Sequence, residues 1–115
     1  MAKIYGIKNC DAMKKGFRWL EENSVTYSFH DYKKEEVDQR VLKQAIKEHG
    51  WELVINKRGT TWRKLDKSIQ DSINDQSAVN LALDNPSIIK RPLLVHKNKT
   101  YLGFKPEEYS VIFSI

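Results

Sequence analysis

The sequence predicts an α/β domain in which a mixed four-stranded sheet is flanked by helices. Residues 3–7 are rich in β-branched and aromatic side chains, which is typical of a buried strand. A helical pattern begins at Asp11, and residues 25–32 then alternate large and polar side chains as a second strand does. Near the end of the chain, residues 93–103 have the pattern of a β-hairpin. A strand, a helix and a parallel strand followed by an antiparallel hairpin form a mixed sheet.

The first strand leads directly into the first helix, and the only cysteine lies between them. Gly6 permits a close approach of the backbone, and Lys8 and Asn9 form a turn. The apolar residues that recur at helical spacing after the turn are Ala12, Phe17, Trp19 and Leu20. The pattern therefore predicts that Cys10 lies at the N-terminus of a helix.

The residue pattern in the middle of the chain predicts a helical insertion at about residues 36–86. Asp38 is expected to cap a helix that Gly50 ends, and this helix would bury Val41, Leu42, Ala45 and Ile46. Residues 51–55 continue as an apolar stretch into a basic loop at 56–64. One or two short helices follow, with an apolar stripe formed by Ile69, Ile73, Ala78, Leu81, Ala82 and Leu83. Asn85 and Pro86 end the last of them.

The C-terminal part completes the sheet. Pro92 precedes a strand at 93–96, Asn98 and Lys99 signal a turn, and residues 100–103 return antiparallel. A final helix follows Pro106, with two glutamates in its first turn and Val111, Ile112 and Phe113 available for packing. This order of elements is the layout of a thioredoxin-like fold, and we expect residues 1–115 to form one such domain.

The length, composition and net charge of the chain favour some classes of function over others. With 115 residues, 40% of them hydrophobic and 30% charged, the chain can build one core. It has no apolar run of membrane-spanning length and no signal-peptide core, so we expect a cytoplasmic monomer. The net charge of +5 suits an anion, and the aromatic residues are not interleaved with Lys and Arg as base-stacking residues would be. A small anionic substrate is therefore favoured over nucleic acid or a membrane.

Cys10 is the candidate reactive group. The free amides and the positive end of the helix dipole favour the thiolate, and so do Lys8, Lys14 and Lys15, whereas the Asp11 carboxylate opposes it. A single cysteine excludes an internal disulfide, so redox chemistry needs a thiol from another molecule. The three histidines, His30, His49 and His96, have no metal-ligand spacing, and we expect no metal and no bound cofactor.

The loop at 56–64 combines Arg58 and other basic residues with small residues and Trp62. Clustered guanidinium groups on such a loop could cradle an anion. A solvated connection with Trp62 packed into the core is the alternative. The loop by itself does not decide between them.

The sequence resembles the arsenate reductase (ArsC) and Spx family over essentially its whole length, and within it the YffB-like branch. The resemblance rests on four ordered motifs: residues 5–10 with the following helix, 58–65, 88–93 and 102–106. It implies a nucleophilic Cys10, an oxyanion held by Arg58 and Arg91, and a cis Pro92 beside the cysteine. A third family arginine is replaced by Lys105, a point charge instead of a planar two-pronged donor.

Two departures from the family pattern bear on function. Met13 occupies the position of the second cysteine of redox-switch Spx proteins, so an intramolecular disulfide switch is absent. Asp11 would repel a doubly charged oxyanion, which disfavours arsenate. The resemblance to the YffB-like branch implies a glutathione-dependent thiol reductase.

We therefore expect a monothiol oxidoreductase in which Cys10 forms a covalent intermediate that glutathione or a glutaredoxin resolves. Arg58 and Arg91, helped by Lys8 and Lys105, would bind the anionic part of the substrate, with Pro92 and Asn9 shaping the site. The alternatives are an arsenate reductase that uses the same residues, a non-enzymatic Spx-like regulator that binds RNA polymerase, and a thioredoxin-fold protein that has lost activity.

Overall fold

A computed structural model describes residues 1–115, which form two compact units. The first unit combines residues 1–35 with residues 91–115, and the second comprises residues 36–90. The elements of the first unit are β1 (Ala2–Gly6), α1 (Asp11–Glu22), β2 (Tyr27–Asp31), β3 (Leu93–His96), β4 (Lys99–Leu102) and α7 (Pro106–Phe113). No helix of the structure is long and apolar enough to cross a membrane.

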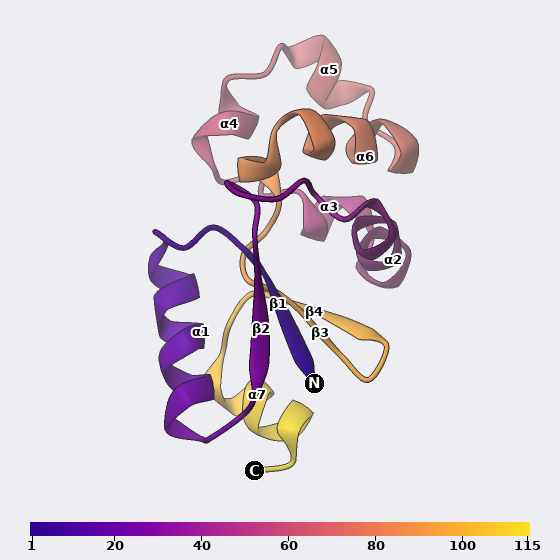
Figure 1. Ribbon diagram of the computed structural model, residues 1–115. Coiled ribbons are helices and arrows are strands. Elements are labelled where there is room, and N and C mark those ends of the chain that lie inside the picture. The colour runs from indigo at the N-terminus through magenta and orange to yellow at the C-terminus, as the bar shows by residue number, and fades with distance from the viewer. The chain divides into compact units, whose positions relative to one another are not determined.

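The four strands of the first unit form one mixed sheet in the order β2-β1-β3-β4 (Figure 1). β1 runs parallel to β2, with Ile4 opposite Phe29, and antiparallel to β3, with Ile4 opposite Leu94. β3 and β4 are antiparallel and are joined by Lys97 and Asn98, whose φ angles of 50° and 65° suit a tight hairpin turn. The sheet with its flanking helices is the predicted thioredoxin-like fold.

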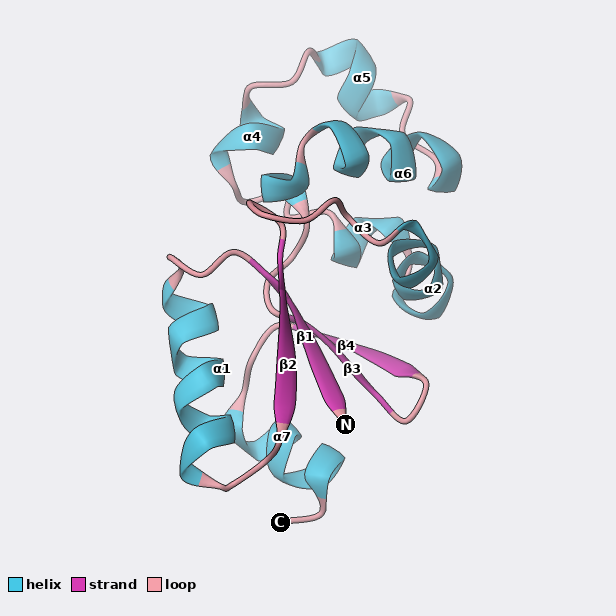
Figure 2. Cartoon of the chain, in the orientation of Figure 1, coloured by secondary structure: helices cyan, strands magenta, loops and turns pink.

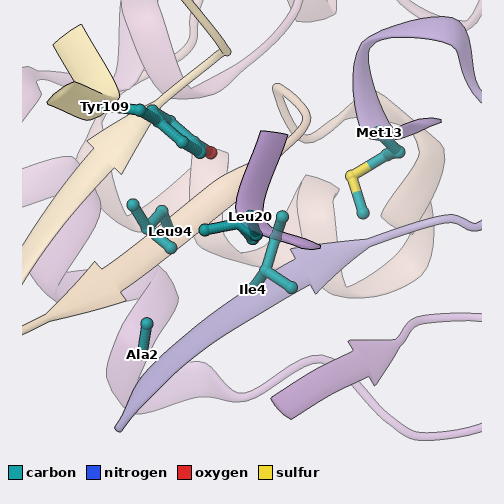
Figure 3. Close-up of a cluster of buried hydrophobic side chains, with 6 residues drawn as sticks. All are labelled: Ala2, Ile4, Met13, Leu20, Leu94 and Tyr109. Carbon is teal, nitrogen blue, oxygen red and sulfur yellow. The ribbon is translucent and has the colours of Figure 1, made fainter. Parts of the chain in front are cut away.

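The two helices of the first unit, α1 and α7, pack against one face of this sheet. Alternate strand residues share a face, so Ala2 and Ile4 of β1 point the same way as Leu94, the partner of Ile4. These side chains join residues of α1 and α7 in a single buried cluster, formed by Ala2, Ile4, Met13, Leu20, Leu94 and Tyr109 (Figure 3). Each large side chain in it contributes about 1.5–3 kcal/mol through the apolar area that it buries.

The start of α1 lies unusually close to the end of β1. A Cβ atom added at Gly6 would lie 2.6 Å from Sδ of Met13 and 2.9 Å from its Cε, which is closer than such atoms approach each other. Met13 is fully buried, and its thioether therefore packs directly against the Gly6 backbone. This contact fixes the first turn of α1 against the strand that leads to Cys10.

The second unit is helical (Figure 2). Its elements are α2 (Gln39–His49), α3 (Trp51–Val54), α4 (Thr60–Arg63), α5 (Lys67–Asp71), α6 (Asp75–Asp84) and the 3-10 helix η1 (Pro86–Ile88). The predicted cap is confirmed, since Asp38 accepts hydrogen bonds from the backbone N–H groups of Arg40 and Val41. Gly50, with φ of 88°, ends α2 in a conformation that favours glycine.

The structure corrects several details of the sequence prediction. The first strand begins and ends one residue earlier than predicted, as does β4, and β2 is shorter than the predicted 25–32. The predicted loop at 56–64 contains the single helical turn α4. Ile69 and Val111 were expected to pack in the core, but they are 41% and 80% exposed. Ile112 and Phe113, by contrast, pack against the buried cluster of the first unit as expected.

Replacing Gly6 by Ala should lower the free energy of unfolding by about 1–3 kcal/mol, because the new methyl group must displace the buried Met13 thioether. Gly16→Ala is the matched control. Its Cβ would meet its nearest neighbours at 3.8 Å, and alanine in a helix interior is favoured over glycine by up to about 1 kcal/mol. Urea unfolding followed by circular dichroism measures both. Equal effects of the two substitutions would contradict the packing described for Gly6.

Replacing Tyr109 by Phe should leave the free energy of unfolding unchanged or raise it by about 1–2 kcal/mol, because the buried Tyr109 hydroxyl has no hydrogen-bond partner. The ring itself should remain essential, since it meets Trp19 and Phe104 edge-on at centroid distances of 5.5 and 4.7 Å. Tyr109→Ala should therefore lower the free energy of unfolding by about 3–5 kcal/mol. A clear loss of stability in Tyr109→Phe would mean that the hydroxyl is bonded.

Candidate active site

Cys10 occupies the N-cap of α1, as predicted from the strand-turn-helix pattern. Its backbone is extended, with φ of −151° and ψ of 133°, and its carbonyl accepts the first helical hydrogen bond from Lys14 N–H at 2.9 Å. The Cys10 N–H donates to the Lys8 carbonyl at 3.1 Å and so closes the turn after β1. The side chain is a free thiol that is partly exposed. It is therefore accessible and faces the unpaired amides of the helix.

The surroundings of Cys10 favour its thiolate. Partial burial by itself raises the pKa of the Cys10 thiol, but several groups outweigh burial. Hydrogen bonds from the Met13 N–H, the Arg91 side chain and the Ala12 N–H, together with the positive charge of Arg91, bring the pKa below its usual value. The opposing charge of Asp11, which the sequence left in the balance, does not prevent this net lowering.

Arg91 and Pro92 are brought beside Cys10 by the approach to β3. The Arg91–Pro92 peptide bond is cis, as the family resemblance implies. A Cβ atom added at Gly6 would lie 3.5 Å from Cγ of Arg91, so the aliphatic part of this side chain passes over the end of β1. Pro92 is buried, and its carbonyl accepts a hydrogen bond from Gly103 N–H at 2.9 Å. Arg91 thus lies beside the thiol in the segment that leads into β3.

The other expected site residues are distributed more widely. Lys8 and Asn9 are exposed in the turn that precedes Cys10, and Lys105 is exposed at the N-cap of α7 in the same unit. Arg58 belongs to the second unit, where its backbone N–H donates to Oδ1 of Asn56 at 3.2 Å in an exposed turn. The anion-binding roles of these residues stay predictions.

The histidines lie in surroundings that fit structural roles. His30 is 8% exposed, its ring contacts those of Tyr5 and Tyr32, and its Nδ1 is 4.0 Å from Oε1 of Glu35. The ring of His96 packs against that of Phe113 at a centroid distance of 4.7 Å with the planes tilted by 49°, and burial together with Lys97 and the N-terminus lowers the pKa of His96. No three His, Cys, Asp or Glu residues gather where they could hold a metal ion.

The sequence reasoning expected free helix amides at Cys10 without naming them, and it missed the role of the Met13 side chain. The amides are the backbone N–H groups of Ala12 and Met13, which lower the pKa of the Cys10 thiol, and the Met13 side chain holds this turn in place. Met13 was considered only as a missing second cysteine. Its position could have signalled the role, since amides two and three residues after an N-cap point back at the capping side chain.

Comparisons with known proteins show the family to which this chain is similar. Residues 5–112 match the model of the ArsC family. The solved structure of the YFFB protein is 45% identical, covers 97% of this chain and 98% of its own, and superposes with a TM-score of 0.93.

Two further relatives bear on function. An arsenate reductase (ArsC) related protein from Brucella melitensis is 45% identical over 99% of this chain and 95% of its own, with a TM-score of 0.77. The global transcriptional regulator Spx of Staphylococcus aureus is 26% identical over 110 residues, which are 94% of this chain and 83% of the regulator. The match over nearly the whole chain, together with the thiol at the N-cap of α1, establishes that the protein belongs to the ArsC family.

Proposed function

We propose that this protein is a monothiol oxidoreductase that uses Cys10 as its nucleophile and glutathione as its co-substrate. The observation that supports this most strongly is the free, partly exposed Cys10 thiol at the N-cap of α1, where two helix amides and Arg91 lower its pKa against the effect of burial. The thiolate is the nucleophilic form of cysteine, so a lowered pKa increases its fraction near neutral pH. A thiolate also needs no general base.

The reaction proceeds by two exchanges. Cys10 thiolate attacks the glutathione sulfur of a mixed disulfide between glutathione and a second thiol, forms a Cys10–glutathione disulfide and releases the second thiol as a thiolate. A second glutathione thiolate then attacks this intermediate, which gives glutathione disulfide and restores Cys10. Glutathione must perform this second step, or a glutaredoxin in its place, because the chain has no other cysteine.

Positively charged side chains near Cys10 bind the anionic groups of the substrate. The Arg91 guanidinium already contacts the thiol, and a planar group with several donors can bind a carboxylate as well. Lys8 and Lys105 would add positive charge from the turn and from the start of α7, and Arg58 is the second guanidinium that the family resemblance assigns to this task. Glutathione carries two carboxylates and one ammonium group, which suits such surroundings. A reducing cytoplasm would keep Cys10 as a thiol.

Arsenate reduction is the second candidate, and the likeness to an arsenate reductase (ArsC) related protein favours it. In that reaction Cys10 would attack arsenate held by Arg91 and Arg58. Asp11, exposed one residue from the nucleophile, would repel a doubly charged arsenate more than a glutathione carboxylate. An Spx-like regulatory role has weaker support, because Met13 replaces the second cysteine of the redox switch and the identity to Spx is 26%.

The first test couples the protein to NADPH through glutathione and glutathione reductase, with a glutathione mixed disulfide of a small thiol as substrate. We expect NADPH consumption that Cys10→Ser abolishes, because serine cannot form the disulfide intermediate. Parallel reactions contain arsenate and a glutaredoxin. Consumption that depends on arsenate would favour the second candidate, and consumption equal in wild type and Cys10→Ser would contradict both.

Replacing Arg91 by Met should raise the pKa of the Cys10 thiol, because the variant loses both the hydrogen bond and the positive charge that lower it. The rate of Cys10 alkylation by iodoacetamide, measured against pH, reports this pKa. The curve should move to higher pH in Arg91→Met and move less in Arg91→Lys, which keeps the charge but not the planar donor group. Arg40→Met, on α2, is the control. Superimposable curves for wild type and Arg91→Met would refute the role given to Arg91.

A further inference from the structure

Asp11 is an acidic residue beside the nucleophile for which the fold shows no contact. It is the first residue of α1, directly after Cys10, and it is exposed. Its carboxylate forms no hydrogen bond and no ion pair, although Lys14 and Lys15 follow at the spacing of helical ion pairs. At the start of α2, by contrast, the Asp38 carboxylate accepts hydrogen bonds from two backbone N–H groups. Asp11 is therefore a free hydrogen-bond acceptor at the reactive end of α1.

The stability of α1 explains why an acidic residue stands in its first turn, but not why it stands next to Cys10. The helix dipole favours a carboxylate at any position of that turn. A carboxylate directly after the nucleophile also opposes the thiolate, because two neighbouring negative charges repel each other. The helix amides and Arg91 nevertheless bring the pKa of Cys10 below its usual value. The site thus tolerates a charge that its own thiolate disfavours, and a contact between this charge and the substrate would explain why.

The charged groups around Cys10 complement those of glutathione. Arg91 contacts the thiol, and the exposed side chains of Lys8 and Lys105 belong to the same unit, so cations are present for the two carboxylates of glutathione. Its ammonium group requires an acceptor instead. Asp11 is placed to provide one, because helical side chains tilt toward the N-terminus of their helix, where Cys10 lies. Arsenate has no cationic group and leaves Asp11 without a partner.

We propose that Asp11 binds the ammonium group of the γ-glutamyl residue of glutathione and thereby makes the site selective for a thiol that carries positive as well as negative charge. This inference rests on the proposed function, in which glutathione is the co-substrate, and assigns one of its groups to a residue. The net charge of the chain cannot produce the same selectivity. With a net charge of +5, the chain would attract the more negative of two ligands.

The test compares two disulfides that differ only at this ammonium group. One is the mixed disulfide of glutathione and hydroxyethanethiol, and the other contains N-acetylglutathione, in which a neutral amide replaces the ammonium group. The Cys10 thiolate attacks the glutathione sulfur, and hydroxyethanethiolate leaves. The second-order rate constant of adduct formation is measured by intact-protein mass spectrometry for the wild type, Asp11→Asn and Glu22→Gln. Glu22, exposed at the C-terminal end of α1, is the matched control for the loss of one negative charge.

We expect the wild type to react about two- to fivefold faster with the glutathione disulfide than with its N-acetyl form, which is the effect of one exposed ion pair. Asp11→Asn should lose this preference, and Glu22→Gln should keep it. The ratio of the two rate constants within one protein is independent of the pKa of Cys10, so an altered thiolate fraction in Asp11→Asn does not affect the comparison. Equal rates in the wild type, a faster reaction of the N-acetyl form, or an unchanged preference in Asp11→Asn would overturn the proposal while leaving the proposed function intact.

A second measurement separates this inference from the proposed function if Cys10 reacts with neither disulfide. Two methanethiosulfonates, one with an aminoethyl and one with a sulfonatoethyl group, convert an accessible thiolate to a mixed disulfide and release methanesulfinate. The ratio of the cationic to the anionic rate constant should fall at least about twofold in Asp11→Asn and stay unchanged in Glu22→Gln. This result would support recognition of an ammonium group by Asp11 even though glutathione itself had failed as a substrate. An unchanged ratio in Asp11→Asn would refute the role given to Asp11.

Discussion

The packing of Met13 against Gly6 positions the reactive end of this protein. Because Gly6 has no side chain, the Met13 thioether reaches the backbone of β1, and the first turn of α1 is held against the end of the strand. This turn supplies the Ala12 and Met13 amides that lower the pKa of the Cys10 thiol. The Arg91 side chain passes over the same glycine. A larger residue at Gly6 would therefore disturb the helix amides and the guanidinium together.

The same groups that stabilise the Cys10 thiolate can also stabilise an anion bound beside it. Partial burial excludes some water from Cys10 and by itself makes the thiolate less favourable, yet fixed amides and one guanidinium reverse that effect. These donors stay in place whether they face the thiolate or an anion bound beside it, so little reorganisation is needed as charge moves during the reaction. With Met13 buried where a second thiol would stand, resolution of any Cys10 disulfide depends on a thiol from solution.

Much of this structure could be predicted from the sequence, because its elements are marked by strong local signals. The 2-residue and 3.6-residue periodicities with Gly50, Pro92 and Pro106 as boundaries predicted the order of strands and helices, and they placed Cys10 at a helix N-terminus. The helix α4 escaped prediction because a single turn leaves no periodic pattern. Val111 and Phe113 could not both face the core, since they are about 200° apart around a helix.

The chemistry of the site was harder to predict than its position. The sequence names the groups that raise and lower the Cys10 pKa, but their balance depends on distances and burial that only the folded chain has. The sequence reasoning named Ala12, but not Met13, among the apolar residues of the helix. The structure buries Met13 completely, and the close approach to Gly6, which explains this, cannot be read from helical spacing. The cis state of the Arg91–Pro92 bond was implied by family resemblance alone.

The central claim is that Cys10 forms a disulfide with glutathione that a second glutathione removes. Intact-protein mass spectrometry after incubation with glutathione disulfide tests it most directly, followed by addition of reduced glutathione and by peptide mapping. We predict one glutathione adduct on the peptide that contains Cys10, and its quantitative removal by reduced glutathione at neutral pH. Failure of the folded protein to acquire the adduct, while the unfolded chain acquires it readily, would contradict the account.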